Sequence, residues 1–122
     1  MKPSPLAGLQ VLLVEDDAII ALGLQSALEQ AGAQAVSLAH TVAQAMTLMD
    51  RSSFDVAVLD FRLERETSTP VAVRLSQVNV PYLFHTSAPN EPASFHPGVP
   101  IMHKPTRPEQ LIAAVAALAA KR

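Results

Sequence analysis

The sequence predicts an α/β fold: a doubly wound, five-stranded parallel sheet with helices on both faces. Two observations predict it. First, short apolar runs rich in Val and Leu alternate with stretches whose apolar residues have helical spacing. Second, several of the runs lack the apolar–polar alternation of a strand with one solvent-exposed face. The strands are expected at residues 11–14, 35–38, 56–59, 82–84 and 99–102. A β-α unit repeated about five times is typical of a parallel sheet.

Three of the intervening stretches have an apolar stripe at helical spacing. The first is predicted to end at Gly32, a glycine suited to a helix C-terminus. The second opens at Thr41, with Gln44 three residues on, which is a capping-box pattern. The last opens at Thr106, with Pro108 in its first turn. The expected stripes are Ile20, Leu24, Ala27, Leu28 and Ala31; Val42, Ala45, Met46 and Met49; and Leu111, Ile112, Val115 and Leu118.

Proline interrupts the rhythm in the second half of the chain. Seven of the ten prolines fall between Pro81 and Pro108. Proline lacks the amide donor and clashes with the preceding helical turn, so the fourth helix is expected to be shortened or disordered, at most one distorted turn. The third helix, within 69–77, is expected to be short because Pro81 soon follows.

Length and composition narrow the class of protein. A chain of 122 residues fits one domain, expected to span 1–122. It contains no cysteine, which excludes disulfides and thiolate chemistry, and its net charge of −2 gives no electrostatic footprint for nucleic acid. The longest apolar run, 111–120, is shorter than the roughly 20 residues that cross a bilayer. We therefore expect a cytoplasmic domain that binds neither nucleic acid nor membrane.

Polar residues stand where the predicted strands end, which is where open parallel sheets bind ligands. Glu15 and Asp16 follow the first strand, Asp60 the third, Thr86 the fourth and Lys104 the fifth. In the flavodoxin-like order 2-1-3-4-5 the first and third strands are neighbours, so the three acids would converge. Crowded carboxylates need a counter-charge, and an all-oxygen ligand set suits Mg²⁺.

Such a pocket is suited to a phosphoryl group, with Asp60 as the candidate nucleophile. Lys104 would add positive charge, and Thr86 would donate its hydroxyl to a phosphoryl oxygen. Other polar residues have plainer interpretations. Asp17 is expected to cap the first helix, and the histidines 85 and 103 to be strand-end residues with one satisfied nitrogen. The charged residues after Asp60 are expected to form a solvated loop; they are Arg62, Glu64, Arg65 and Glu66.

These residues together resemble the signature of bacterial response-regulator receiver domains. The resemblance rests on the segment Val14-Glu15-Asp16-Asp17, the run 55–60 ending in Asp60, Thr86, and Lys104-Pro105. It implies that Asp60 accepts phosphate from a sensor histidine kinase or phosphotransfer protein. It also implies that Mg²⁺ is held by Glu15, Asp16, Asp60 and the backbone carbonyl of Arg62. Thr86 and Lys104 would contact the phosphoryl group. In the family the peptide bond that corresponds to Lys104-Pro105 is often cis.

Two further features qualify the resemblance. Ile101 stands where the family usually has a switch aromatic. The segments 66–72 and 81–86 are similar to a group of alphaproteobacterial stand-alone receivers with a reduced fourth helix, although His85 and Ser87 depart from that group's motif. Exposed Ile19, on the first helix, is a candidate contact for the kinase.

The leading hypothesis is thus a phosphoacceptor that does not turn over external substrates. Because the chain stops after the last helix, no output domain is expected, and the signal would pass to a downstream protein partner. One alternative is a Mg²⁺-dependent phosphohydrolase working through an aspartyl phosphate, which needs a second acid where Arg62 stands. The other is a pseudo-receiver that binds partners without phosphate. The sequence identifies neither the kinase, the downstream target nor the oligomeric state.

Overall fold

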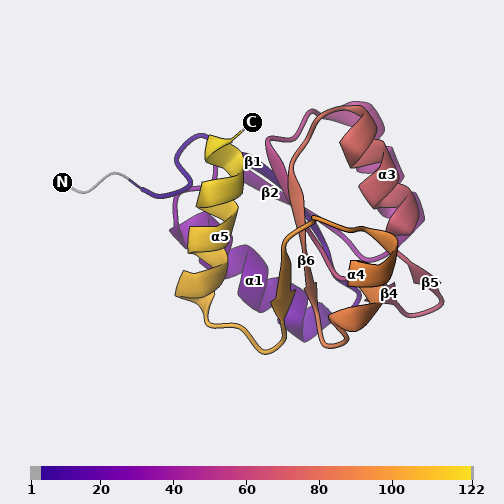
Figure 1. The fold of residues 1–122 in the computed structure, drawn as a ribbon. Helices are drawn as coiled ribbons and strands as arrows, with labels where there is room; N and C mark the ends of the chain where they lie inside the picture. Colours follow the sequence, from indigo (N-terminus) through magenta and orange to yellow (C-terminus); the bar gives the residue numbers. More distant parts are fainter. Residues whose placement is uncertain (1–3, 122) are drawn as a thin grey trace.

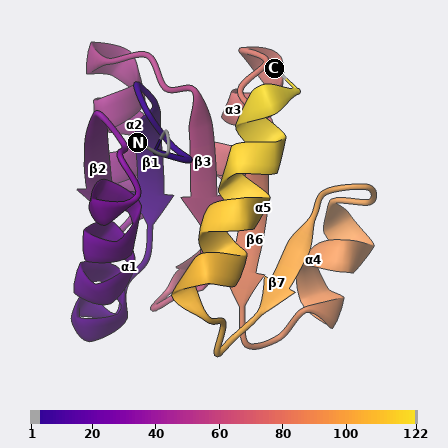
Figure 2. The same cartoon turned by 90° about the vertical axis from the view of Figure 1, so that its left-hand side faces the viewer.

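A computed structural model describes residues 4–121, so the ends of the domain expected at 1–122 lie outside the described residues. The main sheet is parallel and holds β1 (Gln10–Val14), β2 (Ala35–Ala39), β3 (Val56–Leu59), β6 (Tyr82–Thr86) and β7 (Ile101–His103). Its spatial order is β2-β1-β3-β6-β7, seen across the sheet in Figure 2. Counted along the chain, this is the predicted order 2-1-3-4-5.

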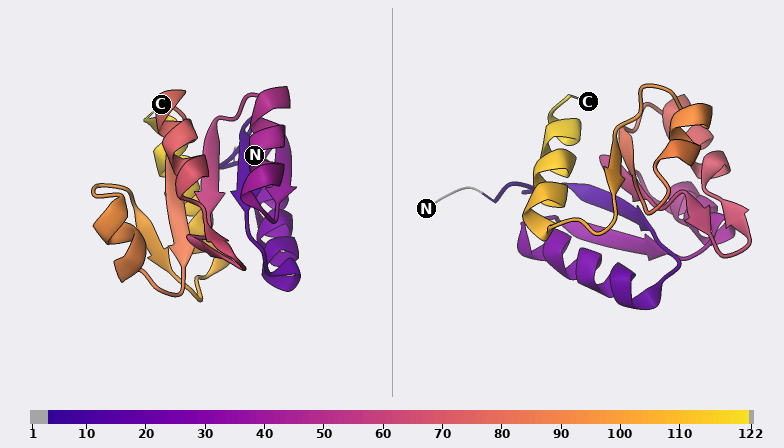
Figure 3. Two further views of the ribbon diagram at one scale, coloured as in Figure 1. Left: turned by 90° about the vertical axis from the view of Figure 1, so that its right-hand side faces the viewer. Right: turned by 60° about the horizontal axis from the view of Figure 1, so that its bottom comes forward.

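Helices cover both faces of this sheet, as Figures 1 and 3 show. Helices α1 (Ala18–Gln30) and α5 (Pro108–Ala120) pack on one face, and α2 (Val42–Arg51) and α3 (Thr69–Gln77) on the other. The short α4 (Asn90–Phe95) lies beside the β6–β7 edge, on the side away from α5. The predicted doubly wound α/β fold is confirmed.

The core has two halves, one on each side of the sheet. Leu12 and Val14 of β1 face the α2–α3 half, while Val11 and Leu13 face the α1–α5 half. All four side chains are fully buried. A strand covered on both faces needs apolar residues at every position, which explains the unbroken apolar runs.

The ends of α1 follow the prediction, but its buried face is rotated slightly. Asp17 Oδ1 accepts hydrogen bonds from the backbone N–H groups of Ile19 and Ile20, both at 3.0 Å, and Gly32 takes a φ of +103° just past the helix. The prediction placed Ile20 in the core stripe and Ala21 outside it. Instead Ala21 is fully buried and Ile20 is exposed, because the buried line runs through Ala21 and Leu28 and Ile20 lies at its edge.

The expected opening of α5 is wrong by one residue. Arg107, not Thr106, precedes the helix, and its backbone N–H is hydrogen-bonded to Gln110 Oε1 at 3.4 Å. Pro108 is the first helical residue, where a missing N–H removes no intrahelical bond. The Thr106 hydroxyl has other partners, described below.

The proline-rich segment forms a short α4 of six residues, which confirms the shortened helix but is longer than the single distorted turn expected. Pro92 is tolerated as the third residue because the first four helical N–H groups have no intrahelical acceptor. The four charged residues expected in a solvated loop after Asp60 are indeed all exposed, but the backbone there is not a loop. The chain forms an antiparallel hairpin of β4 (Arg62–Leu63) and β5 (Glu66–Thr67), which is anchored because Leu63 is buried.

Aromatic rings link β6 to the segment after β3. Tyr82 meets Phe84 edge-on with ring centroids 5.7 Å apart, and Phe84 meets Phe61 in the same way at 5.6 Å. The exposed ring of Phe95, at the end of α4, stacks on Phe61 at 6.2 Å. This aromatic row fixes Phe61, the residue directly after Asp60. Among the described residues, no helix is both long and apolar enough to span a bilayer.

Candidate functional site

Three carboxylates meet at the carboxyl ends of β1 and β3. The two strands are paired in register up to Val14 and Leu59, and the Asp60 N–H continues the ladder to the Val14 carbonyl at 2.8 Å. Glu15 and Asp60 are buried and Asp16 is partly exposed. One ligand atom from each of Glu15, Asp16 and Asp60 lies within 4.8 Å of the others. The predicted convergence of these acids is what the structure shows.

Lys104 reaches this cluster from the end of β7. Its Nζ donates to Glu15 Oε1 at 2.6 Å and to Asp60 Oδ2 at 2.9 Å. Its backbone N–H donates to the Thr86 carbonyl at 2.8 Å, and the Lys104-Pro105 peptide bond is cis. One ammonium group therefore offsets part of the charge of two buried carboxylates.

Burial and the neighbouring charges shift the pKa values of Asp60 and Lys104. Burial is the largest influence and raises the pKa of Asp60 to about 7; the hydrogen bond from Lys104 opposes this, and the Glu15 charge adds to it. Burial alone would lower the pKa of Lys104, but its hydrogen bonds to Glu15 and Asp60 outweigh that influence and raise it. The pocket is short of positive charge when all three acids are ionised.

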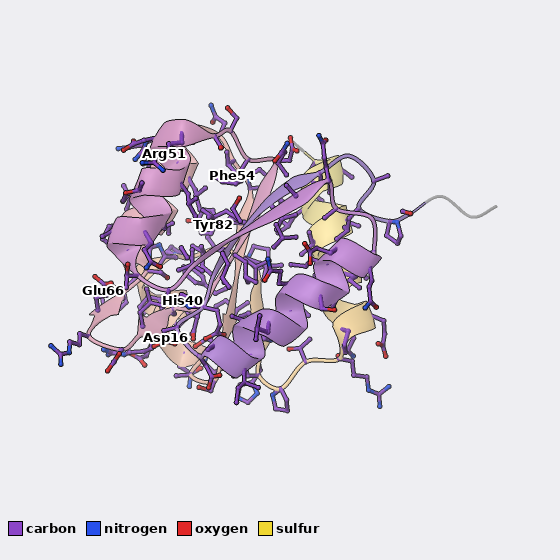
Figure 4. The ribbon with its side chains drawn as sticks, turned by 180° about the vertical axis from the view of Figure 1, so that it is seen from behind. Asp16, His40, Arg51, Phe54, Glu66 and Tyr82 are labelled. Atoms are coloured by element: carbon purple, nitrogen blue, oxygen red, sulfur yellow. The ribbon has the colours of Figure 1, made fainter. Side chains whose placement is uncertain are left out.

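The donor set fits a hard divalent cation. All three acidic ligands offer oxygen, and Asp16 is open to solvent on one side, as Mg²⁺ requires in order to keep bound water. A cleft of about 310 Å³ adjoins the site, lined by Asp16, by residues of the β4–β5 hairpin, and by His40 and Thr41, which directly precede α2. Figure 4 shows Asp16, His40 and Glu66 gathered at this end of the molecule.

The other two predicted site residues, Thr86 and Arg62, have side-chain partners outside the acidic cluster. Thr86 is buried, and its Oγ1 accepts a hydrogen bond from the Ala88 N–H at 3.2 Å. The Arg62 side chain points to α4, where its Nη2 lies 2.6 Å from Glu91 Oε2. The alternative of a hydrolase needs an acid at this position, and the guanidinium ion-paired there offers none.

Sequence reasoning missed several contacts that shape the site. His40 Nδ1 donates to the Glu15 carbonyl at 2.9 Å, and Glu66 of the hairpin accepts from the Val42 N–H at 3.0 Å, at the start of α2. Buried His85 has Nε2 3.0 Å from Thr106 Oγ1, and its Nδ1 has no partner among the described residues. The expectation of one satisfied nitrogen therefore holds for His85. No sequence motif identifies its partner.

An acidic pocket completed by one lysine, at the carboxyl ends of a doubly wound sheet, defines a receiver-type domain. The chain belongs to the response regulator receiver domain family, whose model matches residues 11–116. Comparison with curated proteins gave no match.

Solved structures agree with this assignment. A response regulator receiver protein from Sinorhizobium medicae is 28% identical with a TM-score of 0.82, covering 93% of this chain and 95% of that one. SdrG from Sphingomonas melonis is 32% identical with a TM-score of 0.78, covering 96% and 98%. The anti-anti-sigma factor PhyR from Bartonella quintana shares the fold at 22% identity and a TM-score of 0.84. The chain covers 51% of that protein's length, about half.

Proposed function

We propose that this receiver domain accepts a phosphoryl group on Asp60, in a Mg²⁺-dependent manner, from a histidine kinase or phosphotransfer protein, and then signals through contacts with another protein. The observation that carries the proposal is the pair of bonds from Lys104 Nζ to Glu15 and Asp60. It places a cation beside a nearly buried aspartate, at the end of the sheet where a ligand can enter.

The reaction needs an ionised Asp60 oxygen. That oxygen forms a bond to phosphorus while the N–P bond of a partner phosphohistidine breaks, and the imidazole leaves with the electron pair. With a pKa raised to about 7, Asp60 is incompletely ionised near neutral pH. Bound Mg²⁺, held by Glu15, Asp16, Asp60 and the Arg62 carbonyl, would supply positive charge opposite the phosphoryl oxygens. Lys104 would supply the second positive charge, and Thr86 a hydroxyl donor.

A partner would approach over the exposed rim of the site. Ile19, at the start of α1 next to the acidic pair, is 84% exposed, and Leu22 is exposed on the same helix. Exposed apolar side chains on the helix that follows the acidic pair fit a partner that docks through an apolar helix face. This supports the contact role proposed for Ile19.

The test is incubation with acetyl phosphate and Mg²⁺, followed by intact mass measurement. The wild type is expected to gain one phosphoryl group, as is Asp50→Asn, which removes an exposed aspartate on α2. The Asp60→Asn variant should gain none. Steady release of phosphate from unrelated monoesters would instead indicate a hydrolase. No modification by acetyl phosphate or by any phosphohistidine donor would indicate a pseudo-receiver.

A further inference from the structure

His85 lies on the opposite side of β6 from Thr86 and contacts the chain that carries Lys104. Side chains alternate along the strand: Phe84 belongs to the α2–α3 half of the core and Leu83 to the α1–α5 half. By this alternation His85 shares the face of Leu83, and the residue is 4% exposed. The residue adjacent in sequence to the proposed phosphoryl ligand Thr86 thus points toward the start of α5.

The hydrogen bonds of His85 fix its tautomer. The Thr106 hydroxyl donates its one proton to the His103 carbonyl at 3.0 Å, so it can only accept from His85. Nε2 of His85, 3.0 Å away, therefore carries the hydrogen and Nδ1 carries none. Burial, with the nearby Lys104 charge, lowers the pKa of His85 to about 4, so the ring is neutral at neutral pH.

These bonds hold the segment 103–106 to β6 at two places. One is the backbone bond from the Lys104 N–H to the Thr86 carbonyl. The other runs from His85 through the Thr106 hydroxyl to the His103 carbonyl. The Lys104 side chain leaves the backbone between these two attachments and extends to Glu15 and Asp60. A flexible lysine loses much rotamer freedom in reaching two fixed acceptors, so a fixed backbone origin lowers the cost of placing its ammonium.

We propose that His85 is a positioning residue: through the Thr106 hydroxyl it holds the segment 103–106 so that Lys104 reaches Asp60 and the incoming phosphoryl group. The proposal rests on the phosphoacceptor function of Asp60 given above. It assigns Thr106 to this chain of bonds, in place of the helix-capping role that its sequence position suggested. It predicts that loss of the hydroxyl acts only through Lys104.

The test pairs Thr106→Val, which keeps the side-chain shape, with Thr106→Ser, which restores the hydroxyl. Thr47→Val, the same change at an exposed position on α2, is the matched control. The rate of Asp60 phosphorylation by acetyl phosphate at saturating Mg²⁺ is expected to fall about fivefold in Thr106→Val, the effect of about one neutral hydrogen bond. Thr106→Ser and Thr47→Val should keep the wild-type rate. His85→Phe should match Thr106→Val where it folds.

A double-mutant cycle separates positioning from general destabilisation. If Thr106 acts through Lys104, Lys104→Met with Thr106→Val will be no slower than Lys104→Met alone. If the two substitutions instead reduce the phosphorylation rate independently, so that their fold losses multiply in the double variant, the proposal is wrong. A wild-type rate in Thr106→Val would also overturn it.

A second measurement does not depend on phosphorylation. NMR of protein whose lysines carry ¹³C at Cε should give one signal for each of the three lysines. The signal that disappears in Lys104→Met belongs to Lys104. The two Cε protons of Lys104 should have different chemical shifts in the wild type and Thr106→Ser, because the side chain is held in one position. In Thr106→Val the side chain should move more freely, and the two shifts should average to one. Unchanged signals in Thr106→Val would refute the positioning role. If the wild type accepts no phosphate, the proposed function fails, and this comparison still decides the role of His85.

Discussion

Replacing Asp60 by asparagine should stabilise the folded protein in the absence of Mg²⁺. The folded state raises the pKa of this carboxyl from 3.8 to about 7, mainly through burial. A shift of that size corresponds to about 4 kcal/mol of unfavourable free energy once the group is ionised. Asparagine removes the charge but weakens the bond from Lys104, which offsets part of the gain. We expect a net stabilisation of about 1–3 kcal/mol at pH 8.

The sign of the pH dependence follows from the direction of the shift. Between about pH 4 and pH 7 the folded state binds more protons at Asp60 than the unfolded state does, so this residue makes stability fall as pH rises through that window. The advantage of Asp60→Asn over the wild type should therefore grow from pH 5 to pH 8. Other titrating groups, present in both proteins, largely cancel in the difference.

Urea unfolding without Mg²⁺ at the two pH values measures this difference. The control is Asp50→Asn, whose side chain is 66% exposed, and it should show no comparable gain at pH 8. Millimolar Mg²⁺ should then stabilise the wild type more than Asp60→Asn, because binding to the folded state requires the full acidic set. An Asp60→Asn advantage equal at both pH values, or a variant less stable than the wild type at pH 8, would refute the electrostatic reasoning.

Three other outcomes are expected. Glu91→Gln, which removes the partner of Arg62, should speed amide exchange across α4 several-fold and leave global unfolding unchanged; slow exchange in the variant would show that α4 does not depend on this contact. Leu83→Ala should cost about 2–5 kcal/mol in urea unfolding, whereas exposed Leu22→Ala should cost less than about 0.5. Because burial lowers the pKa of His85 to about 4, this residue should reduce the stability by roughly 3 kcal/mol as pH falls from about 6.5 toward 4. His85→Gln should reduce this pH dependence, and an unchanged slope of stability against pH in the variant would contradict the prediction.

The sheet and the acidic cluster could be predicted because each depends on a local pattern. Unbroken apolar runs indicate buried strands, and the rule that ligands bind at the carboxyl ends of parallel strands places Glu15 and Asp60 together. No side-chain geometry was needed for this. The start of α5 was less predictable: Thr106 and Arg107 are adjacent, and a hydrogen bond across the fold to His85 favours the later start.

The contacts that complete the site were not predictable from spacing. Arg62 and Glu91 are 29 positions apart, and the chain between them forms a hairpin, a helix and a strand whose exact path decides whether they meet. The hairpin itself depends on Leu63, one apolar residue in a charged segment that otherwise indicates a solvated loop. A single buried side chain is too weak a periodic signal to reveal two strands of two residues.

The aromatic row gives the molecule an intrinsic optical probe. The chain has one tyrosine, four phenylalanines and no tryptophan, so emission excited at a wavelength that phenylalanine does not absorb comes from Tyr82 alone. That ring is nearly buried, its hydroxyl lies 3.3 Å from Ser76 Oγ, and its contacts run through Phe84 to Phe61, next to Asp60. Unlabelled protein can therefore be followed in a fluorimeter, because any rearrangement that displaces Phe61 reaches the fluorophore through two ring contacts.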